Sequence, residues 1–181
     1  MKLWSVVAVI VLSSAAYLTM QFRAPGALSV DRPNQPPIQL VPEDDAVIEA
    51  ATARARATID TLLAALARTQ SPPKQAQLKV RIEDEGVVEH VWLVDLRYQG
   101  GMIYGALGNE PLQLENWRLG DAAMVDPSEI TDWLLIDENG LQGGYTLRAS
   151  RERMTPQERE RFDADFATHF GVAPERLDDV R

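Results

Sequence analysis

The chain lacks cysteine altogether and has only two histidines among its 181 residues. Without cysteine there is no disulfide, no thiolate zinc site, no cysteine nucleophile and no lipid-bearing cysteine of the bacterial lipoprotein kind. Basic residues are in the minority, because 18 Lys and Arg stand against 27 Asp and Glu, and the formal net charge is −9. An acidic surface repels phosphate backbones, so we expect no nucleic-acid partner.

The N-terminal residues 1–22 contain a run without charge, LWSVVAVIVLSSAAYLTM, that follows Lys2. As a helix these eighteen residues would reach about 27 Å, enough for the core of a bilayer. We interpret the segment as a signal anchor, and a signal peptide cleaved among the small residues 13–16 is the alternative. Lys2 favours a cytoplasmic amino terminus. The predicted location is therefore the bacterial cell envelope, with a periplasmic domain anchored to the inner membrane.

Proline marks the next segment, residues 23–42, where five of the 19 residues from 24 to 42 are proline. We expect an extended tether there, because proline removes backbone donors and disfavours helices and central strands. Residues 43–181 remain as a single domain. The whole chain is 45% apolar and 25% charged, which is ordinary for a globular protein.

The domain begins with apolar residues at helical spacing, which predict an amphipathic helix over 44–67. From 76 to 149 the period changes to two, which predicts strands. The predicted strands pass through Leu78, Val80 and Ile82 and cover 88–98, 102–108, 130–137 and 141–148. Gly100-Gly101 and Asn139-Gly140 are hairpin signals.

A second helix is predicted after Thr155, because Thr155-Pro156-Gln157-Glu158 combines a capping box with proline at the first helical position. The sequence therefore predicts an α+β fold. Its core is a small antiparallel, partly barrel-like sheet of about five strands, packed by the N-terminal amphipathic helix and the C-terminal helix.

Five phrases occur in order along this domain: EHVWL (89–93), YGALGNEP (104–111), LGD (119–121), ITDW (130–133) and GGYTLR (143–148). Together they resemble the YegJ-like family of uncharacterised bacterial proteins over roughly residues 44–165. The resemblance implies a small α+β domain, often in secreted or envelope proteins. It implies no particular activity.

One of the two histidines, His90, lies in a predicted strand, where alternation places it with Trp92 and Val94 on the more apolar face. We interpret it as a neutral, hydrogen-bonded core or rim residue. The alternative is a hydrolase in which His90 works with Glu89, Asp121 or Asp132 as acid and base. Ser128 lacks a nucleophile-elbow motif, and no ligand spacing predicts a metal or other cofactor.

Turn residues and aromatic residues near His90 suggest a binding rim. The candidate rim residues are His90, Asn109, Glu110, Asp121, Asp132 and Trp133. The function we favour is a non-catalytic envelope module that binds a protein, a peptide or a small ligand beside the sheet. A hydrolase and an inhibitor or immunity-type partner protein are the alternatives.

The export hypothesis predicts that a reporter enzyme active only outside the cytoplasm works when fused after Pro42. Activity of a cytoplasm-only reporter at the same junction would contradict it. Retention of the chain in membranes after a carbonate wash distinguishes the anchor from a cleaved signal.

Overall fold

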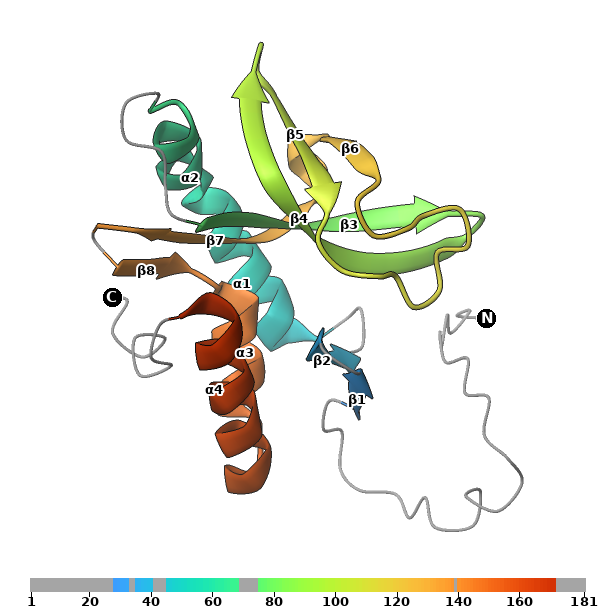
Figure 1. The fold of residues 1–181 in the computed structure, drawn as a ribbon, viewed down its shortest axis with the longest axis vertical. Coiled ribbons are helices and arrows are strands. Elements are labelled where there is room, and N and C mark those ends of the chain that lie inside the picture. The colour runs from blue at the N-terminus through green and yellow to red at the C-terminus, as the bar shows by residue number, and fades with distance from the viewer. Residues whose placement is uncertain (1–27, 33–34, 41–44, 69–74, 139, 172–181) are drawn as a thin grey trace.

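The computed structural model describes residues 28–32, 35–40, 45–68, 75–138 and 140–171, and its main feature is one antiparallel sheet with helices around it (Figure 1). The strands of this sheet follow the order β6-β5-β4-β3-β7-β8. The predicted α+β class is confirmed. The sheet has six strands, and its first and last strands do not pair with each other, so it is open where the sequence predicted a partly barrel-like sheet.

Most strands of the sheet lie where the sequence predicted them. The six strands are β3 (Gln75–Asp84), β4 (Val87–Gln99), β5 (Met102–Leu107), β6 (Ala122–Val125), β7 (Ile130–Asp137) and β8 (Gly140–Gly143). The strands predicted at 88–98, 102–108 and 130–137 are confirmed. Gly100 and Gly101 both have positive φ, 61° and 83°, as the two-residue turn between β4 and β5 requires. The sequence did not predict β6.

The predicted helix at 44–67 is two helices, α1 (Ala46–Ala57) and α2 (Ile59–Leu66). The break at Thr58 has a cause in the neighbouring strand. The indole Nε1 of Trp133 donates to the carbonyl oxygen of Ala55 at 3.0 Å, and the Thr58 amide also donates to it. In a continuous helix the Ala55 carbonyl oxygen would accept a hydrogen bond from the Ile59 amide. Because Trp133 of β7 takes that position, its side chain interrupts the helical hydrogen bonds.

The strand predicted at 141–148 is wrong beyond residue 143. There β8 ends and the helix α3 (Tyr145–Glu152) begins. Gly143 and Gly144 have φ of 76° and 70°, and this left-handed backbone, which glycine adopts readily, ends the strand. The carboxylate of Asp132 then accepts hydrogen bonds from the first two amides of α3.

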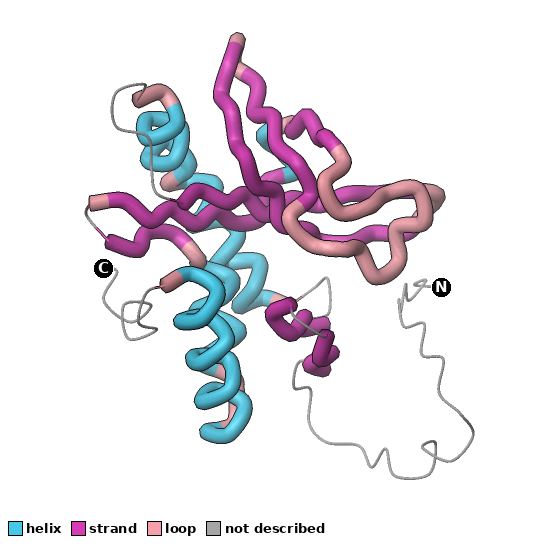
Figure 2. The backbone as a smooth tube through the Cα atoms, viewed as in Figure 1, coloured by secondary structure: helices cyan, strands magenta, loops and turns pink. Residues whose placement is uncertain are grey.

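The C-terminal helix α4 (Pro156–Phe170) is as predicted. The Thr155 hydroxyl accepts from the Glu158 amide, and the Glu158 carboxylate accepts from the Thr155 amide, which completes the capping box. Gly171 ends the helix with φ of 65°. Helices α1 to α4 gather around the β7 end of the sheet, and β4, β5 and β6 form the other end (Figure 2).

A separate pair of short strands precedes the domain. β1 (Leu28–Arg32) and β2 (Gln35–Leu40) pair antiparallel, and β2 contacts α4. They lie inside the proline-rich segment, for which the sequence predicted no pairing. The predicted anchor at 1–22 lies outside the described residues. Within the described ranges, none of the helices combines the length and the apolar run that a bilayer crossing requires.

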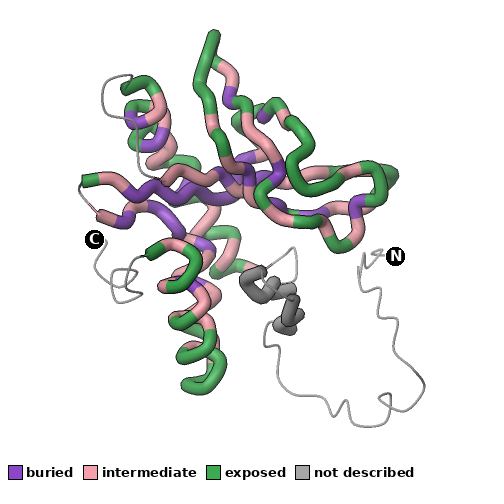
Figure 3. The backbone as a smooth tube through the Cα atoms, in the orientation of Figure 1, coloured by how far each residue is buried: buried purple, intermediate pink, exposed green. Residues whose placement is uncertain are grey.

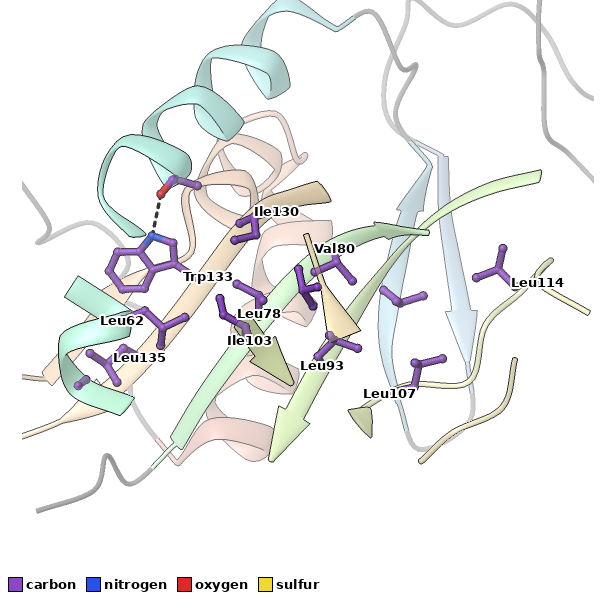
Figure 4. Packing of buried hydrophobic residues seen from close by; sticks show 14 residues of the cluster. Leu62, Leu78, Val80, Leu93, Ile103, Leu107, Leu114, Ile130, Trp133 and Leu135 are labelled. Atoms are coloured by element: carbon purple, nitrogen blue, oxygen red, sulfur yellow. Dashed lines mark hydrogen bonds between the residues drawn. The ribbon is translucent and has the colours of Figure 1, made fainter. Parts of the chain in front are cut away.

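The core has two parts, one on each face of β7, and burial is concentrated in β7 and the adjoining strands (Figure 3). On one face Leu62, Leu78 and Trp133 belong to a cluster that includes residues of α1 and α2 (Figure 4). On the other face Leu134, Ile136 and Phe166 belong to a cluster that includes residues of α4. β7 is therefore covered on both faces, which explains its nearly continuous apolar sequence.

The substitution Gly143→Ala tests how closely the backbone of β8 approaches β7. A Cβ there would lie 2.1 Å from the carbonyl oxygen of Trp133, whereas a Cβ at Gly101 would meet nothing within 4 Å. Both glycines have positive φ, so alanine costs about 1 kcal/mol at either site. We expect Gly101→Ala to lose about that much in urea unfolding. Gly143→Ala should lose about 3 kcal/mol or more, because the backbone must also move. Equal losses would contradict the close approach.

Candidate functional site

The two faces of β4 are the reverse of those the sequence suggested. Glu89, Val91 and Leu93 are buried, whereas His90 is exposed and Trp92 is half-buried. The prediction that His90 lies on the buried apolar face is therefore wrong. The buried carboxylate of Glu89 is satisfied, because it accepts from the backbone amides of Leu112 and of its neighbour Gln113 at 2.9 Å. An acid can thus occupy the buried face of a strand without an unpaired charge.

His90 makes one hydrogen bond across the sheet, with 3.1 Å between its Nδ1 and the hydroxyl oxygen of Thr131. Thr131 falls in a bulge, since Lys79 pairs with Asp132 and Val80 pairs with Ile130. The Thr131 hydroxyl also lies 3.3 Å from the carbonyl oxygen of Lys79, to which it donates. It therefore accepts from Nδ1–H of His90, which leaves Nε2 as the second polar atom of the ring.

Positive charges surround His90. Arg81 is its direct partner in the β3–β4 ladder, and Lys79 lies two residues further along the same face. The pKa of His90 is lowered from 6.5 to about 4, first by desolvation of the ring and then by Lys79, Arg81 and Arg56. Because the residue as a whole is exposed, water screens part of these effects. With or without that screening, the lowered pKa leaves the ring neutral at pH 7.

Asp132 is fully buried and serves the fold. Its carboxylate accepts four hydrogen bonds, from the amides of Trp133, Tyr145 and Thr146 and from the Thr146 hydroxyl. Burial raises the pKa of Asp132, and the Thr146 hydrogen bond and the nearby Lys79 act against that rise. Burial likewise lowers the pKa of Lys79, and Asp132 opposes that change. The two groups form a desolvated pair held at the start of α3.

The remaining rim residues also make structural contacts. Asn109 accepts from the Trp92 amide at 2.8 Å, just past the end of β5. Glu110 accepts from the Leu119 amide at 3.1 Å, and Asp121 accepts from the Arg118 amide at 2.8 Å, so both hold the loop before β6. Trp133 is buried on the face of β7 opposite to Asp132. The structure therefore does not bring the predicted rim residues together on one surface.

The acid–base groups suggested for a hydrolase are similarly dispersed. Asp132 and Glu89 are buried and accept backbone amides, and they belong to different faces of the sheet. Ser128 donates its hydroxyl to Asp126 at 2.6 Å within the turn before β7. No group of three or more His, Asp or Glu side chains is arranged for a metal ion in the part of the chain that the structure describes.

The sequence did not indicate a hollow of about 290 Å³ between β3 and β6. Its lining consists of Val80, Arg81, Ile82, Glu83, Trp117, Ala123, Met124, Val125 and Glu129. One wall of this hollow is β6, a strand of only four residues that the sequence did not predict. The available signal was the apolar run 122–125 between the Gly120-Asp121 turn and Asp126-Pro127.

Comparison with known proteins identifies the family. The fold defines the class of the protein, an α+β domain with an antiparallel sheet. The five phrases EHVWL, YGALGNEP, LGD, ITDW and GGYTLR occur in order along it. Residues 45–170 match the family DUF2314, described as an uncharacterized protein conserved in bacteria, and the chain belongs to it. No solved structure matches the chain.

Two relatives extend this comparison. The chain is 38% identical over 89 residues to a putative ankyrin repeat protein of Neisseria meningitidis, which covers 49% of this chain and 35% of the relative. It is 34% identical over 70 residues to the uncharacterized protein YegJ of Escherichia coli, which covers 39% and 46% respectively. The resemblance to the YegJ-like family is thus confirmed. The chain spans less than half the length of either relative.

The structural role of Asp132 predicts a large loss of stability in Asp132→Asn. The new amide would place a donor against the amide and hydroxyl of Thr146 and would leave Lys79 without its counter-charge, so we expect about 3 kcal/mol. Asp126 is a matched control, since it accepts from the amide and hydroxyl of Ser128 in the same way but is exposed. Asp126→Asn should change the free energy of unfolding far less than Asp132→Asn does, because the Asp126 carboxylate is exposed to water. Similar losses in urea unfolding would contradict this assignment.

Proposed function

We propose that this domain is a non-catalytic module that binds an extended segment of a partner protein along the open edge of β3. The proposal depends on the short overlap of β3 with β7, which begins only at Ile130. β3 pairs with β7 only as far as Val80 opposite Ile130, so residues 81–84 of β3 pair with β4 alone. Unpaired backbone groups on a strand edge are a ready template for an added strand.

The hollow beside this edge has the dimensions and chemistry for such a segment. β6 bounds it on the far side and, among the described strands, pairs only with β5. Four strand residues extend over about 13 Å, which suits a short peptide. Val80, Ile82 and Trp117 supply apolar lining, together with Ala123 and Val125. Side chains at alternate positions of an added strand would fill this lining.

The charges favour a basic partner. The lining has two acids, Glu83 and Glu129, and one base, Arg81, which forms an ion pair with Glu83 at 3.0 Å. Within the described residues, no hydrogen bond or ion pair reaches the half-buried carboxylate of Glu129. A net charge of −9 adds attraction for a basic segment. The segment is therefore one with apolar residues at alternate positions and a Lys or Arg at the Glu129 end.

Two further considerations support a binding role. The suggested catalytic carboxylates accept backbone amides, as expected of structural groups. One relative is a putative ankyrin repeat protein, and ankyrin repeats stack into extended binding surfaces.

We also propose that the module acts in the cell envelope, attached through residues 1–22. The uncharged run from Leu3 to Met20 supports this location.

Filling the hollow tests the proposal. Ala123 lines it and is half-buried, whereas its neighbour Ala122 is exposed and does not line it. Peptides selected from a random display library against the full chain would be labelled, and their affinity would be measured by fluorescence anisotropy. We expect Ala123→Leu to weaken binding about tenfold or more, and Ala122→Leu to leave it unchanged. Hydrogen exchange should show that the bound peptide protects those amides of residues 81–84 that do not point toward β4.

The outcomes separate strand addition from other binding modes. Selected peptides rich in apolar and basic residues that lose affinity in Ala123→Leu support the proposal. Equal affinity for both variants, or protection confined to other strands, would overturn it. Failure of the library to yield any peptide above background would also count against it, because an open strand edge accepts many sequences.

A further inference from the structure

A cluster of cations stands on the sheet face around His90, in a chain whose overall charge is strongly negative. Arg81 and Lys79 come from β3, and Arg56 reaches the same region from α1. Arg56 is held in place, because its Nε and Nη2 donate to the carbonyl oxygens of Ile130 and Ser128, both at 2.7 Å. These positive charges repel one another.

The acids near this cluster leave it only partly neutralised. Glu83 pairs with Arg81, but the Glu83 side chain is 57% exposed, and exposed pairs contribute little. Asp132 faces Lys79, but it is buried and its oxygens already accept four hydrogen bonds. Glu129, from the turn before β7, lines the hollow with Arg81. An anion that approaches from solvent would therefore meet cations that nearby acids neutralise only in part.

We propose that His90 and Arg81 bind a small oxyanion group, a carboxylate or a phosphate. The two residues are direct partners in the β3–β4 ladder, so their side chains leave the sheet side by side. Nδ1–H of His90 donates to Thr131, which fixes the ring. Nε2 then takes up a proton when the anion arrives and donates to it, beside the Arg81 guanidinium.

Binding is therefore linked to protonation of His90. The free site keeps the ring neutral, because desolvation and the neighbouring cations disfavour its charged form. A bound anion reverses the electrostatic part of that effect and raises the pKa of His90. By the same linkage the anion binds more tightly as pH falls through the pKa of the complex. This site does not require strand addition, although Arg81 also lines the hollow.

The experiment follows the His90 ring by NMR in the full chain, with its signal assigned by its loss in His90→Gln. Sulfate serves as the tetrahedral oxyanion and acetate as the carboxylate, each against chloride at constant ionic strength. In chloride the pKa of His90 should lie below 6.5. Saturating sulfate should raise that pKa by about one. Acetate, measured at pH 6, should shift the ring signal along a saturable curve if a carboxylate is the natural group.

Matched arginine variants decide whether Arg81 is part of the site. Arg81→Gln should abolish the saturable effect of sulfate and should itself raise the pKa of His90 in chloride, because a cation has been removed. Arg81→Lys should keep part of the effect. Arg97→Gln is the control, because Arg97 is an exposed arginine of β4 whose ladder partner is Tyr104.

Each outcome has a definite meaning. A saturable response to sulfate alone identifies a phosphate-like group, and a response to both anions includes a carboxylate. Either response supports the site, provided that Arg81→Gln removes it. A response no larger than that of chloride would overturn the proposal, as would an undiminished response in Arg81→Gln.

Discussion

Two consecutive residues of β7 attach both helical layers to the sheet. Asp132 points to one face, where its carboxylate accepts the first amides of α3, and Trp133 points to the other, where its indole donates to α1. Both contacts are buried, so their polar atoms would otherwise be unsatisfied. The break between α1 and α2, the start of α3 and the end of β8 all depend on this pair. β7 is thus the strand around which the rest of the domain is arranged.

Local signals accounted for much of the fold. The hairpin turn at Gly100-Gly101 and the capping box at Thr155 depend on neighbouring residues, and both were predicted correctly. The helix α3 was missed because Tyr145 and its neighbours alternate like a strand. The amides of its first turn are satisfied by Asp132, which lies 13 residues earlier in the chain. A contact at that separation overrides the local pattern, and no periodicity reveals it.

The candidate site was harder to predict, because its geometry depends on which face of a strand is covered. Trp92 and Val94 suggested that His90 faces the core, but the opposite face is buried, with Glu89 tied to a distant loop. The bulge that aims Thr131 at His90 also has no sequence signature. His90 was singled out because the chain has only two histidines, and the structure gives its ring a hydrogen bond to Thr131. The sequence did not predict the hollow, because one of its walls is the short strand β6.

The contact between Trp133 and Ala55 spans 78 residues, and this separation affects the order in which the protein is assembled on the ribosome. The helix α1 is made early, but the strand that covers its apolar side is made much later. Until β7 has emerged, that side of the helix has no native partner, and a contact of such long range forms only after its entropy cost has been met. The nascent chain must therefore remain without its native core through most of its synthesis. Apolar surface that is exposed for so long makes a nascent chain prone to aggregation.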